Sequence, residues 1–234
     1  MAPDRELFRT PPARAMLAAS IFSADFAALG ESSLAALKVG ASLLHVDIMD
    51  GHFVPNLSMG PLVCAAVRRV CPDAFLDVHL MVTNPKEFIP AFVKAGANSV
   101  SFHVEAVKNP KELAAFARDL GVSVGLASNP QTPTSVIEPF LNDFELHLVM
   151  SVHPGFSGQG FIESALEKTK WIRARVGSRA RIEMDGGVEP SNGARCVAAG
   201  ADVLVSASAL FGKPNLAQAA KDLLDSFSTT SRVD

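Results

Sequence analysis

The sequence has few cysteines, few charges and no uninterrupted hydrophobic run of membrane length. Only three of its 234 residues are cysteine, which is too few for a disulfide-stapled domain and suits a reducing compartment. Because 48% of the residues are hydrophobic and 19% are charged, the chain is predicted to fold. The longest uncharged stretches, residues 120–137 and 146–162, are broken by proline, glycine and polar residues, so neither is predicted to span a bilayer.

The charged residues show no excess that would indicate a charged partner. The 21 basic and 24 acidic residues are scattered and give a net charge of -3, so we expect neither a nucleic-acid nor a membrane partner. Asp4 and Glu6 argue against a transit peptide, and a cytoplasmic location is expected. No linker divides the chain: we expect a flexible extension over residues 1–14, one domain over 15–228 and a short tail over 229–234.

Eight short apolar runs alternate with longer amphipathic stretches. The runs are of strand length, and the stretches between them are typical of helices. The predicted strands are residues 16–22, 42–49, 75–81, 99–105, 123–128, 145–152, 181–186 and 202–208. The predicted helices are residues 26–39, 61–70, 85–95, 110–120, 134–141, 161–176, 191–199 and 215–227, and Pro61, Pro85 and Pro110 suit the first turns of theirs.

A glycine follows four of the predicted helices, at Gly40, Gly96, Gly121 and Gly200, as expected of helices that end in a left-handed residue. Eight strand–helix units with nearly continuous apolar strands predict parallel strands covered by helices, which right-handed crossovers can close into a ring. The predicted fold is therefore α/β, a single (β/α)8 (TIM) barrel. An open doubly wound sheet is the alternative, but it has no preference for eight units.

Polar side chains gather at the predicted carboxyl ends of the strands, where barrels of this kind carry their sites. Side chains two residues apart share one face of a strand. The pairs aligned in this way are His45 with Asp47, Asp77 with His79, and Glu183 with Asp185. Two imidazoles and two carboxylates from three strands would suit one Zn, Fe, Mn or Co ion. Taken singly, each histidine also fits a structural role, Asp77 fits a paired structural carboxylate, and Met49, Met81 and Met150 fit core packing.

Two carboxylates that hold one cation on opposite sides of a barrel mouth have a chemical use. One can remove a proton from a carbon beside a carbonyl, and the other can deliver a proton to the opposite face, while the cation stabilises the enediolate between the two steps. This pattern predicts an inversion of stereochemistry beside a carbonyl.

Two glycine clusters follow the sixth and seventh predicted strands, in residues 153–160 (HPGFSGQG) and 185–188 (DGGV). Barrels often bind phosphate there through backbone N–H groups, and glycine lets the backbone approach an anion closely. Tight turns alone are the alternative explanation for either loop. Two such loops in consecutive units favour phosphate, and Ser206, Ala207 and Ser208 lie at the end of the eighth strand.

Five motifs together resemble the ribulose-phosphate 3-epimerase family over residues 16–227. They are SIFSADF (20–26), HVDIMDGHFVPN (45–56), DVHLM (77–81), PGF (154–156) and EMDGG (183–187), and the second is long and highly specific. The resemblance implies a (β/α)8 isomerase of the pentose phosphate pathway that interconverts D-ribulose 5-phosphate and D-xylulose 5-phosphate with one divalent metal.

The resemblance also implies roles for individual residues. The metal ligands would be His45, Asp47, His79 and Asp185, with Asp47 as proton acceptor and Asp185 as proton donor. Substrate contacts would come from Ser20, His79, Met49, Met81 and Met150 at the reacting end, and from Gly155, Phe156, Ser157, Gly158, Gly186, Gly187, Ala207 and Ser208 at the phosphate end. We also expect a homo-oligomer.

The chain departs from the family pattern at Ala19, Ser128, His153, Ser157 and Ala207. These positions leave the metal and acid–base residues untouched and cluster near the phosphate end. Ala207 is the most questionable, because its methyl group would crowd an approaching anion where the family has glycine.

Three alternatives stay open. A hexulose 6-phosphate 3-epimerase of the allulose type would share the same catalytic set. A phosphate-binding barrel decarboxylase would carry an Asp-x-Lys-x-x-Asp pattern at a strand end, and no predicted strand end shows it. A non-catalytic sugar-phosphate binding protein is expected to lose metal or proton-transfer residues, and this chain retains them.

Overall fold

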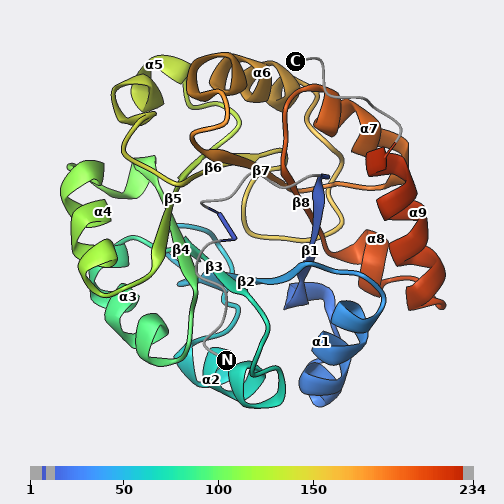
Figure 1. Ribbon diagram of the computed structural model, residues 1–234. Helices are drawn as coiled ribbons and strands as arrows, with labels where there is room; N and C mark the ends of the chain where they lie inside the picture. Colours follow the sequence, from blue (N-terminus) through green and yellow to red (C-terminus); the bar gives the residue numbers. More distant parts are fainter. Residues whose placement is uncertain (1–6, 9–13, 229–234) are drawn as a thin grey trace.

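The eight apolar runs form eight short strands that are buried on both faces. In the computed structural model, which describes residues 7–8 and 14–228, they pair in parallel as a closed barrel (Figure 1). The strands are β1 (Met16–Ser20), β2 (Leu43–Met49), β3 (Leu76–Met81), β4 (Ser99–His103), β5 (Ser123–Ser128), β6 (Leu146–Met150), β7 (Arg181–Asp185) and β8 (Val203–Ser206). Because β8 pairs with β1, at Met16 opposite Val203, the ring is complete and the alternative of an open sheet is wrong.

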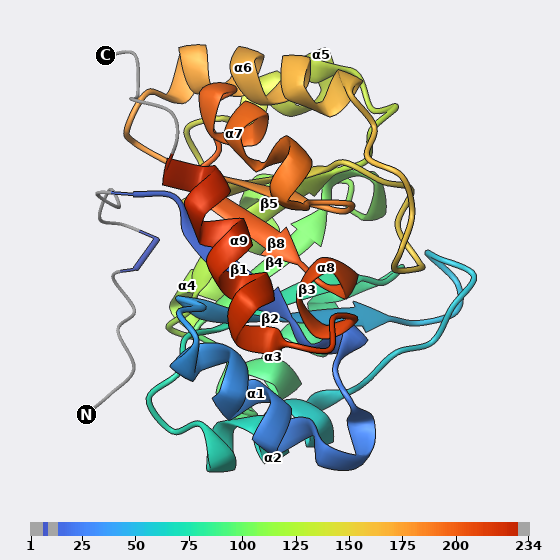
Figure 2. The same cartoon turned by 90° about the vertical axis from the view of Figure 1, so that its right-hand side faces the viewer.

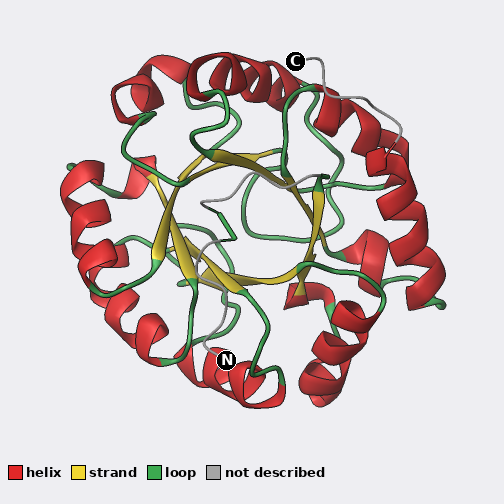
Figure 3. Cartoon of the chain, in the orientation of Figure 1, coloured by secondary structure: helices red, strands yellow, loops and turns green. Residues whose placement is uncertain are grey.

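Helices follow the strands and form an outer layer around them, as the view down the barrel shows (Figure 3). They are α1 (Leu29–Lys38), α2 (Pro61–Val70), α3 (Pro85–Lys94), α4 (Pro110–Asp119), α5 (Thr134–Ile137), α6 (Ser164–Val176), α7 (Pro190–Ala198), α8 (Ser208–Phe211) and α9 (Leu216–Ser228). Short 3-10 turns cover Ile21–Ser23, Phe26–Ala28, Val104–Ala106 and Glu138–Phe140. None of the helices described is long and apolar enough to cross a membrane.

The helix boundaries follow local chemistry. Pro61, Pro85 and Pro110 occupy the first helical positions as predicted. Gly40 has a φ of 110° after α1, where the Ala41 N–H bonds back to the Ala36 carbonyl and closes the helix end. Gly96, Gly121 and Gly200 have the same left-handed backbone.

Several predicted boundaries are wrong. The predicted strands over 16–22 and 99–105 end at Ser20 and His103, because a 3-10 turn begins at the next residue. The predicted helix over 26–39 starts as a 3-10 turn, because the Asp25 carboxylate accepts the Ala27 N–H. The predicted helix over 161–176 starts at Ser164, because the Ile162 N–H bonds back to the Ser151 carbonyl. The predicted strand over 202–208 ends at Ser206, and Ser208 begins the short helix α8 instead.

Two apolar layers hold the barrel together. The larger layer lies between the strands and the surrounding helices, which cover the strands in the side view as well (Figure 2). The smaller layer fills the interior at the amino ends of the strands, where Phe8 packs against Phe75 with ring centroids 4.8 Å apart. The three cysteines are buried and form no disulfide.

Phe8 belongs to the predicted extension, and it is only 1% exposed. It closes the base of the barrel together with Met16, Leu43 and Leu146. The rest of the predicted extension, apart from Leu7 and Arg14, lies outside the described residues, as does the predicted tail over 229–234.

Candidate active site and metal centre

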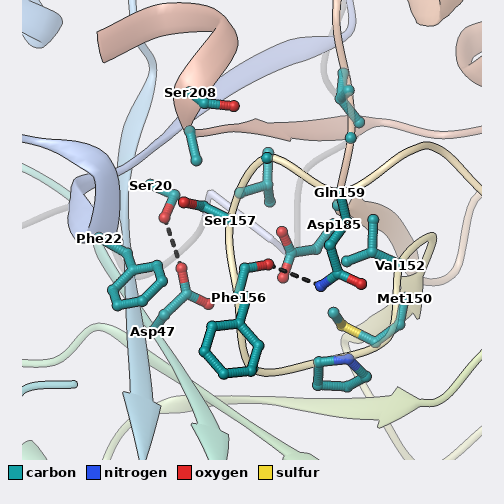
Figure 4. Close-up of a pocket in the computed structure, with 18 of the residues that line it drawn as sticks. Ser20, Phe22, Asp47, Met150, Val152, Phe156, Ser157, Gln159, Asp185 and Ser208 are labelled. Atoms are coloured by element: carbon teal, nitrogen blue, oxygen red, sulfur yellow. Dashed lines mark hydrogen bonds between the residues drawn. The ribbon is translucent and has the colours of Figure 1, made fainter. Parts of the chain in front are cut away.

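A pocket opens at the carboxyl ends of the strands, the end of the barrel at which the polar strand residues gather. The residues that line it come from strands β1, β2, β3, β6, β7 and β8 and from the loops that follow them. Among the predicted site residues, those that line this pocket are Ser20, Asp47, Met49, Met81, Met150, Gly155, Phe156, Ser157, Gly158, Asp185, Gly186, Gly187, Ala207 and Ser208. Figure 4 shows Asp47 and Asp185 with their carboxylates directed into it.

The four predicted metal ligands come together, but only Asp47 and Asp185 line the pocket, whereas His45 and His79 are fully buried next to them. Asp47 and His79 are directly opposite each other on the paired strands β2 and β3. One ligand atom from each of His45, Asp47, His79 and Asp185 lies within 4.8 Å of all the others. The His79 Nδ1 atom is 3.3 Å from Asp47 Oδ1 and 3.4 Å from Asp185 Oδ2.

The donor atoms of this cluster fit a divalent cation. The buried Nε2 atom of His45 has no hydrogen-bond partner, although it lies 3.3 Å from Asp47 Oδ1 and 3.8 Å from Asp185 Oδ2. An orphaned imidazole nitrogen facing two carboxylate oxygens is costly in a dry site unless a positive charge lies between them. Mixed imidazole and carboxylate ligands are what Zn, Fe, Mn and Co accept.

The pKa shifts in the cluster also favour a positive charge among its side chains. Burial lowers the pKa of His79, but the hydrogen bonds with Asp185 and Asp47 outweigh it and raise that pKa to about 9. Burial also opposes charge on His45, yet Asp47 and Glu183 hold the pKa of His45 well above its usual range. Burial raises the pKa of Asp47, and the neighbouring His45 and His79 lower it below its ordinary value. The carboxylates therefore draw positive charge into this space, which protons or a metal can supply.

A second layer of carboxyl groups lies beneath the cluster and orients His45. Asp77 accepts a hydrogen bond from Nδ1–H of His45 at 2.9 Å, and it also accepts one from the Ser99 hydroxyl. The alternative interpretation of Asp77 as a paired structural carboxylate is therefore the one its contacts support. Glu183 Oε1 lies 3.3 Å from the same His45 nitrogen, and burial together with the Asp77 charge raises the pKa of Glu183 to about 8.

A third histidine, to which sequence reasoning gave no role, contacts the predicted ligand His79. The Nε2 atoms of His79 and His103 are 2.9 Å apart, and His103 Nδ1 is 3.2 Å from Glu105 Oε2. Burial lowers the pKa of His103 to about 4, so this imidazole is neutral at physiological pH. Burial raises the pKa of Glu105, but the hydrogen bond from His103 and those from Thr132 and Asn129 lower it to about 2.

The three predicted methionines line the pocket, and each also packs in a small apolar cluster. Met49 and Met81 pack with Val54, and Met150 packs with Ala127, Leu148 and Val152. The Met150 position is paired with Asp185 across β6 and β7. These side chains give the pocket an apolar, polarizable wall beside the two carboxylates.

The predicted phosphate loops lie side by side in the pocket wall: a Cβ atom on Gly187 would be 3.1 Å from the Gln159 carbonyl oxygen. Gly155 and Gly158 have positive φ angles of 125° and 77°, and Gly186 and Gly187 have 116° and 64°. Gln159 stabilises the first loop by donating to the carbonyl of His153 and to that of Phe156, the latter shown in Figure 4.

The departures at Ser157 and Ala207 do not place a side chain in the left-handed region, because no non-glycine residue among those described has a positive φ. Ala207 has a φ of -110° and a ψ of -90° and immediately precedes helix α8. Residues that line the pocket without having been predicted are Phe22, Val152, Pro154, Gln159, Val188 and Val205; of these, Pro154 and Gln159 lie in the glycine-rich segment and were detectable there.

One hydrogen bond connects two loops that are 99 residues apart in the sequence. The Asn56 side chain, in the loop after β2, donates to the Gly155 carbonyl in the loop after β6 at 2.7 Å. The HVDIMDGHFVPN motif thereby contributes both a pair of candidate ligands, His45 and Asp47, and a support for the glycine loop.

Fold and site together define a class: a (β/α)8 barrel enzyme with a buried two-histidine, two-aspartate cluster at the carboxyl ends of its strands. Within that class, the chain belongs to the ribulose-phosphate 3 epimerase family, whose model matches residues 16–211.

Relatives with known names agree. The chain is 43% identical over 203 residues to the ribulose-phosphate 3-epimerase of Serratia marcescens, which covers 86% of this chain and 97% of that protein. It is 44% identical over 211 residues to the enzyme of the same name from Bacillus subtilis, covering 88% and 97%. Among solved structures, the 3-keto-L-gulonate-6-phosphate decarboxylase of Vibrio cholerae aligns with a TM-score of 0.71 at 13% identity, covering 92% and 99%, which shows a shared fold.

Proposed function

We propose that this protein interconverts D-ribulose 5-phosphate and D-xylulose 5-phosphate by moving a proton at C3, with one divalent metal (Zn, Fe, Mn or Co) held by His45, Asp47, His79 and Asp185. The observation that carries the proposal is the placement of two carboxylates, Asp47 from β2 and Asp185 from β7, in one pocket around one set of ligand atoms. This activity belongs to the pentose phosphate pathway.

Asp47 is suited to be the proton acceptor. Its neighbours hold its pKa low, so it is ionised, and the Ser20 hydroxyl donates to its Oδ2 at 2.6 Å (Figure 4). When Asp47 takes the proton from C3, the electron pair of the C3–H bond moves into the C2–C3 bond and the C2 oxygen gains negative charge. The metal, when bound, supplies positive charge beside that oxygen and lowers the cost of the step.

Asp185 is suited to return a proton from the other side. It delivers its proton to C3 on the face opposite Asp47, the C2 carbonyl re-forms, and the configuration at C3 is inverted. After this step Asp47 is protonated and Asp185 is ionised, so the roles reverse for the opposite direction of the reaction.

The remaining residues position the substrate. The backbone N–H groups of the two glycine loops, with Ala207 and Ser208, are placed to hold the phosphate, because this anion binds best to converging N–H groups at a helix start. Met49, Met81 and Met150 exclude water from the reacting carbons, and Ser20 and His79 contact the substrate oxygens.

The test is turnover of D-ribulose 5-phosphate by the metal-loaded protein and its variants. We expect Asp47→Asn and Asp185→Asn each to lower kcat at least about 100-fold, the usual loss for a general acid or base. Asp222→Asn, on the exposed face of α9, is the matched control and keeps wild-type kcat. Near-normal turnover in either site variant would refute the two-aspartate mechanism.

The substrate is assigned by comparing kcat/KM for D-ribulose 5-phosphate with that for D-allulose 6-phosphate across a metal series. A preference for the hexose would replace the pentose assignment. Exchange of the C3 hydrogen in D2O separates catalysis from simple binding, and no exchange with metal present would contradict an enzymatic role. The molar mass of the same samples, measured by light scattering, tests the predicted homo-oligomer.

A further inference from the structure

We infer that His103 is a positioning residue for the metal centre: it accepts the Nε2–H of His79 and thereby leaves Nδ1 of His79, which faces Asp47 and Asp185, as the nitrogen that binds the metal. The inference rests on the proposed metal-dependent function. It concerns a residue on β4, a strand that supplies none of the predicted ligands.

The contact between the two imidazoles is close and enclosed. His79 and His103 are fully buried, their Nε2 atoms are 2.9 Å apart, and their ring planes are within 20° of each other, with centroids 5.0 Å apart. The ring of Phe53 also contacts His103, with centroids 4.7 Å apart. Two nitrogens at this distance share one proton, so one imidazole must donate and the other must accept.

Glu105 decides which imidazole accepts. Its Oε2 lies 3.2 Å from Nδ1 of His103, and an ionised carboxylate can only accept a hydrogen bond. Nδ1 of His103 therefore carries a proton. A His79 that binds the metal through Nδ1 carries its own proton on Nε2, and only one proton fits between the two Nε2 atoms. The Nε2 atom of His103 is left as an acceptor, so the proton between the rings belongs to His79.

Glu105 is itself held in one orientation. Its Oε1 accepts the Asn129 N–H at 2.9 Å and the Thr132 hydroxyl. The buried Lys168 side chain of α6 donates to the carbonyls of Asn129 and Pro130 at 2.5 and 3.2 Å, which holds that loop in place. Helix α6 and the loop after β5 thus support the carboxylate that sets the His103 tautomer.

The two histidine ligands then face the metal position with different nitrogens. His79 presents Nδ1, with Nε2–H given to His103, whereas His45 presents Nε2, with Nδ1–H given to Asp77. A histidine that binds a metal commonly donates the N–H of its second nitrogen to a fixed acceptor. Loss of that acceptor lowers metal affinity by about 10- to 100-fold. For His79 the acceptor is a neutral imidazole instead of a carboxylate.

The experiment measures zinc affinity by competition with a chromophoric chelator. We expect His103→Phe, which keeps the ring and removes both nitrogens, to weaken zinc binding by about 10- to 100-fold. His147→Phe is the matched control: His147 is equally buried, on β6, and its Nε2 donates to the Leu141 carbonyl, so this variant keeps wild-type affinity.

Glu105→Gln tests the tautomer. In this variant the side-chain amide oxygen still accepts the Asn129 N–H, so the side-chain NH2 group faces Nδ1 of His103. An NH2 group only donates, so Nδ1 of His103 has to accept. The His103 proton then moves to Nε2, His79 must accept it, and the His79 proton moves to Nδ1, so zinc affinity falls although size and fold are kept. Wild-type affinity in Glu105→Gln would refute the assignment.

Histidine 15N shifts of the zinc-loaded wild-type protein give a reading that needs no variant. We expect zinc on Nδ1 and a proton on Nε2 for His79, and a proton on Nδ1 for His103. Zinc on Nε2 of His79, or unchanged affinity in His103→Phe, overturns the inference while the wild-type epimerase remains active. A wild-type protein that binds no divalent metal overturns the proposed function and the inference together.

Discussion

Replacing Gly186 by alanine separates two costs that usually occur together, backbone strain and steric overlap. Gly186 follows β7 with a φ of 116°, and a Cβ atom there would lie 2.4 Å from Val152 Cγ2 and 2.8 Å from Cγ1. The Ser151 hydroxyl donates to the Gly186 carbonyl at 2.6 Å, which restrains the backbone from moving aside.

The expected loss is the sum of the two costs. A left-handed backbone costs about 1–2 kcal/mol for an alanine, and overpacking costs about 1–3 kcal/mol. Gly186→Ala should therefore lower the free energy of unfolding by about 2–5 kcal/mol, which lowers Tm by about 4–20 °C at this chain length.

Two other glycines of the same region are the controls. Gly158 has a φ of 77° and nothing within 4 Å of a built Cβ, so Gly158→Ala carries the strain alone, about 1–2 kcal/mol. Gly160 has neither a positive φ nor a close neighbour, and Gly160→Ala should stay within about 0.5 kcal/mol of wild type. The assay is urea unfolding with calorimetric Tm. If Gly186→Ala costs no more than Gly158→Ala, the steric argument is wrong, and if all three cost the same, the argument from glycine conformation is wrong.

Other predictions concern the base of the barrel, a buried histidine and the metal. Phe8→Ala should lower the free energy of unfolding in urea by about 3–5 kcal/mol with kcat unchanged, since Phe8 is 1% exposed and far from the pocket; an unchanged midpoint would contradict its packing role. Burial lowers the pKa of His147 to about 4, so its contribution is present above the unfolded value of about 6.5 and is lost as pH falls below it, by up to about 3 kcal/mol. His147→Phe should flatten stability against pH between 7 and 4, and an unaltered slope would exclude His147 as the source. Removing the metal by dialysis against a chelator should lower Tm, and adding it back at 100 times Kd should restore Tm by raising the free energy of unfolding by about 2.7 kcal/mol. A Tm that does not depend on metal would argue against a metal site in the native state.

The sequence predicted the fold well where local chemistry marks the ends of elements. Helices α2 and α4 begin at the predicted residues, because Pro61 and Pro110 each occupy a first helical position. Helix α2 also ends at the predicted residue, Val70. The segment 134–141 was predicted as one helix and is an α-helical turn followed by a 3-10 turn, because Pro139 has no N–H to continue the α-helical ladder. Tertiary contacts such as the bond from Ile162 to Ser151 leave no local signal, so the start of α6 could not be predicted.

The candidate site was predictable within each strand and not between strands. Period-two alternation placed His45 beside Asp47 and Glu183 beside Asp185 on the correct faces. It does not give the relative heights of neighbouring strands, which decide that His103 contacts His79. The sequence places His103 at the polar end of a predicted strand, but it does not show that His103 contacts His79.

The bond between Asn56 and Gly155 has a consequence for how the mouth of the barrel moves. It joins the loop after β2 to the loop after β6, so opening either loop alone breaks this bond and costs about 0.5–1.5 kcal/mol. A ligand that fixes the glycine loop would slow the fluctuations of residues 50–57 as well, although it touches none of them. Hydrogen exchange would then report sugar-phosphate binding at two places in the sequence at once, and Asn56→Ala would leave only one of them responsive.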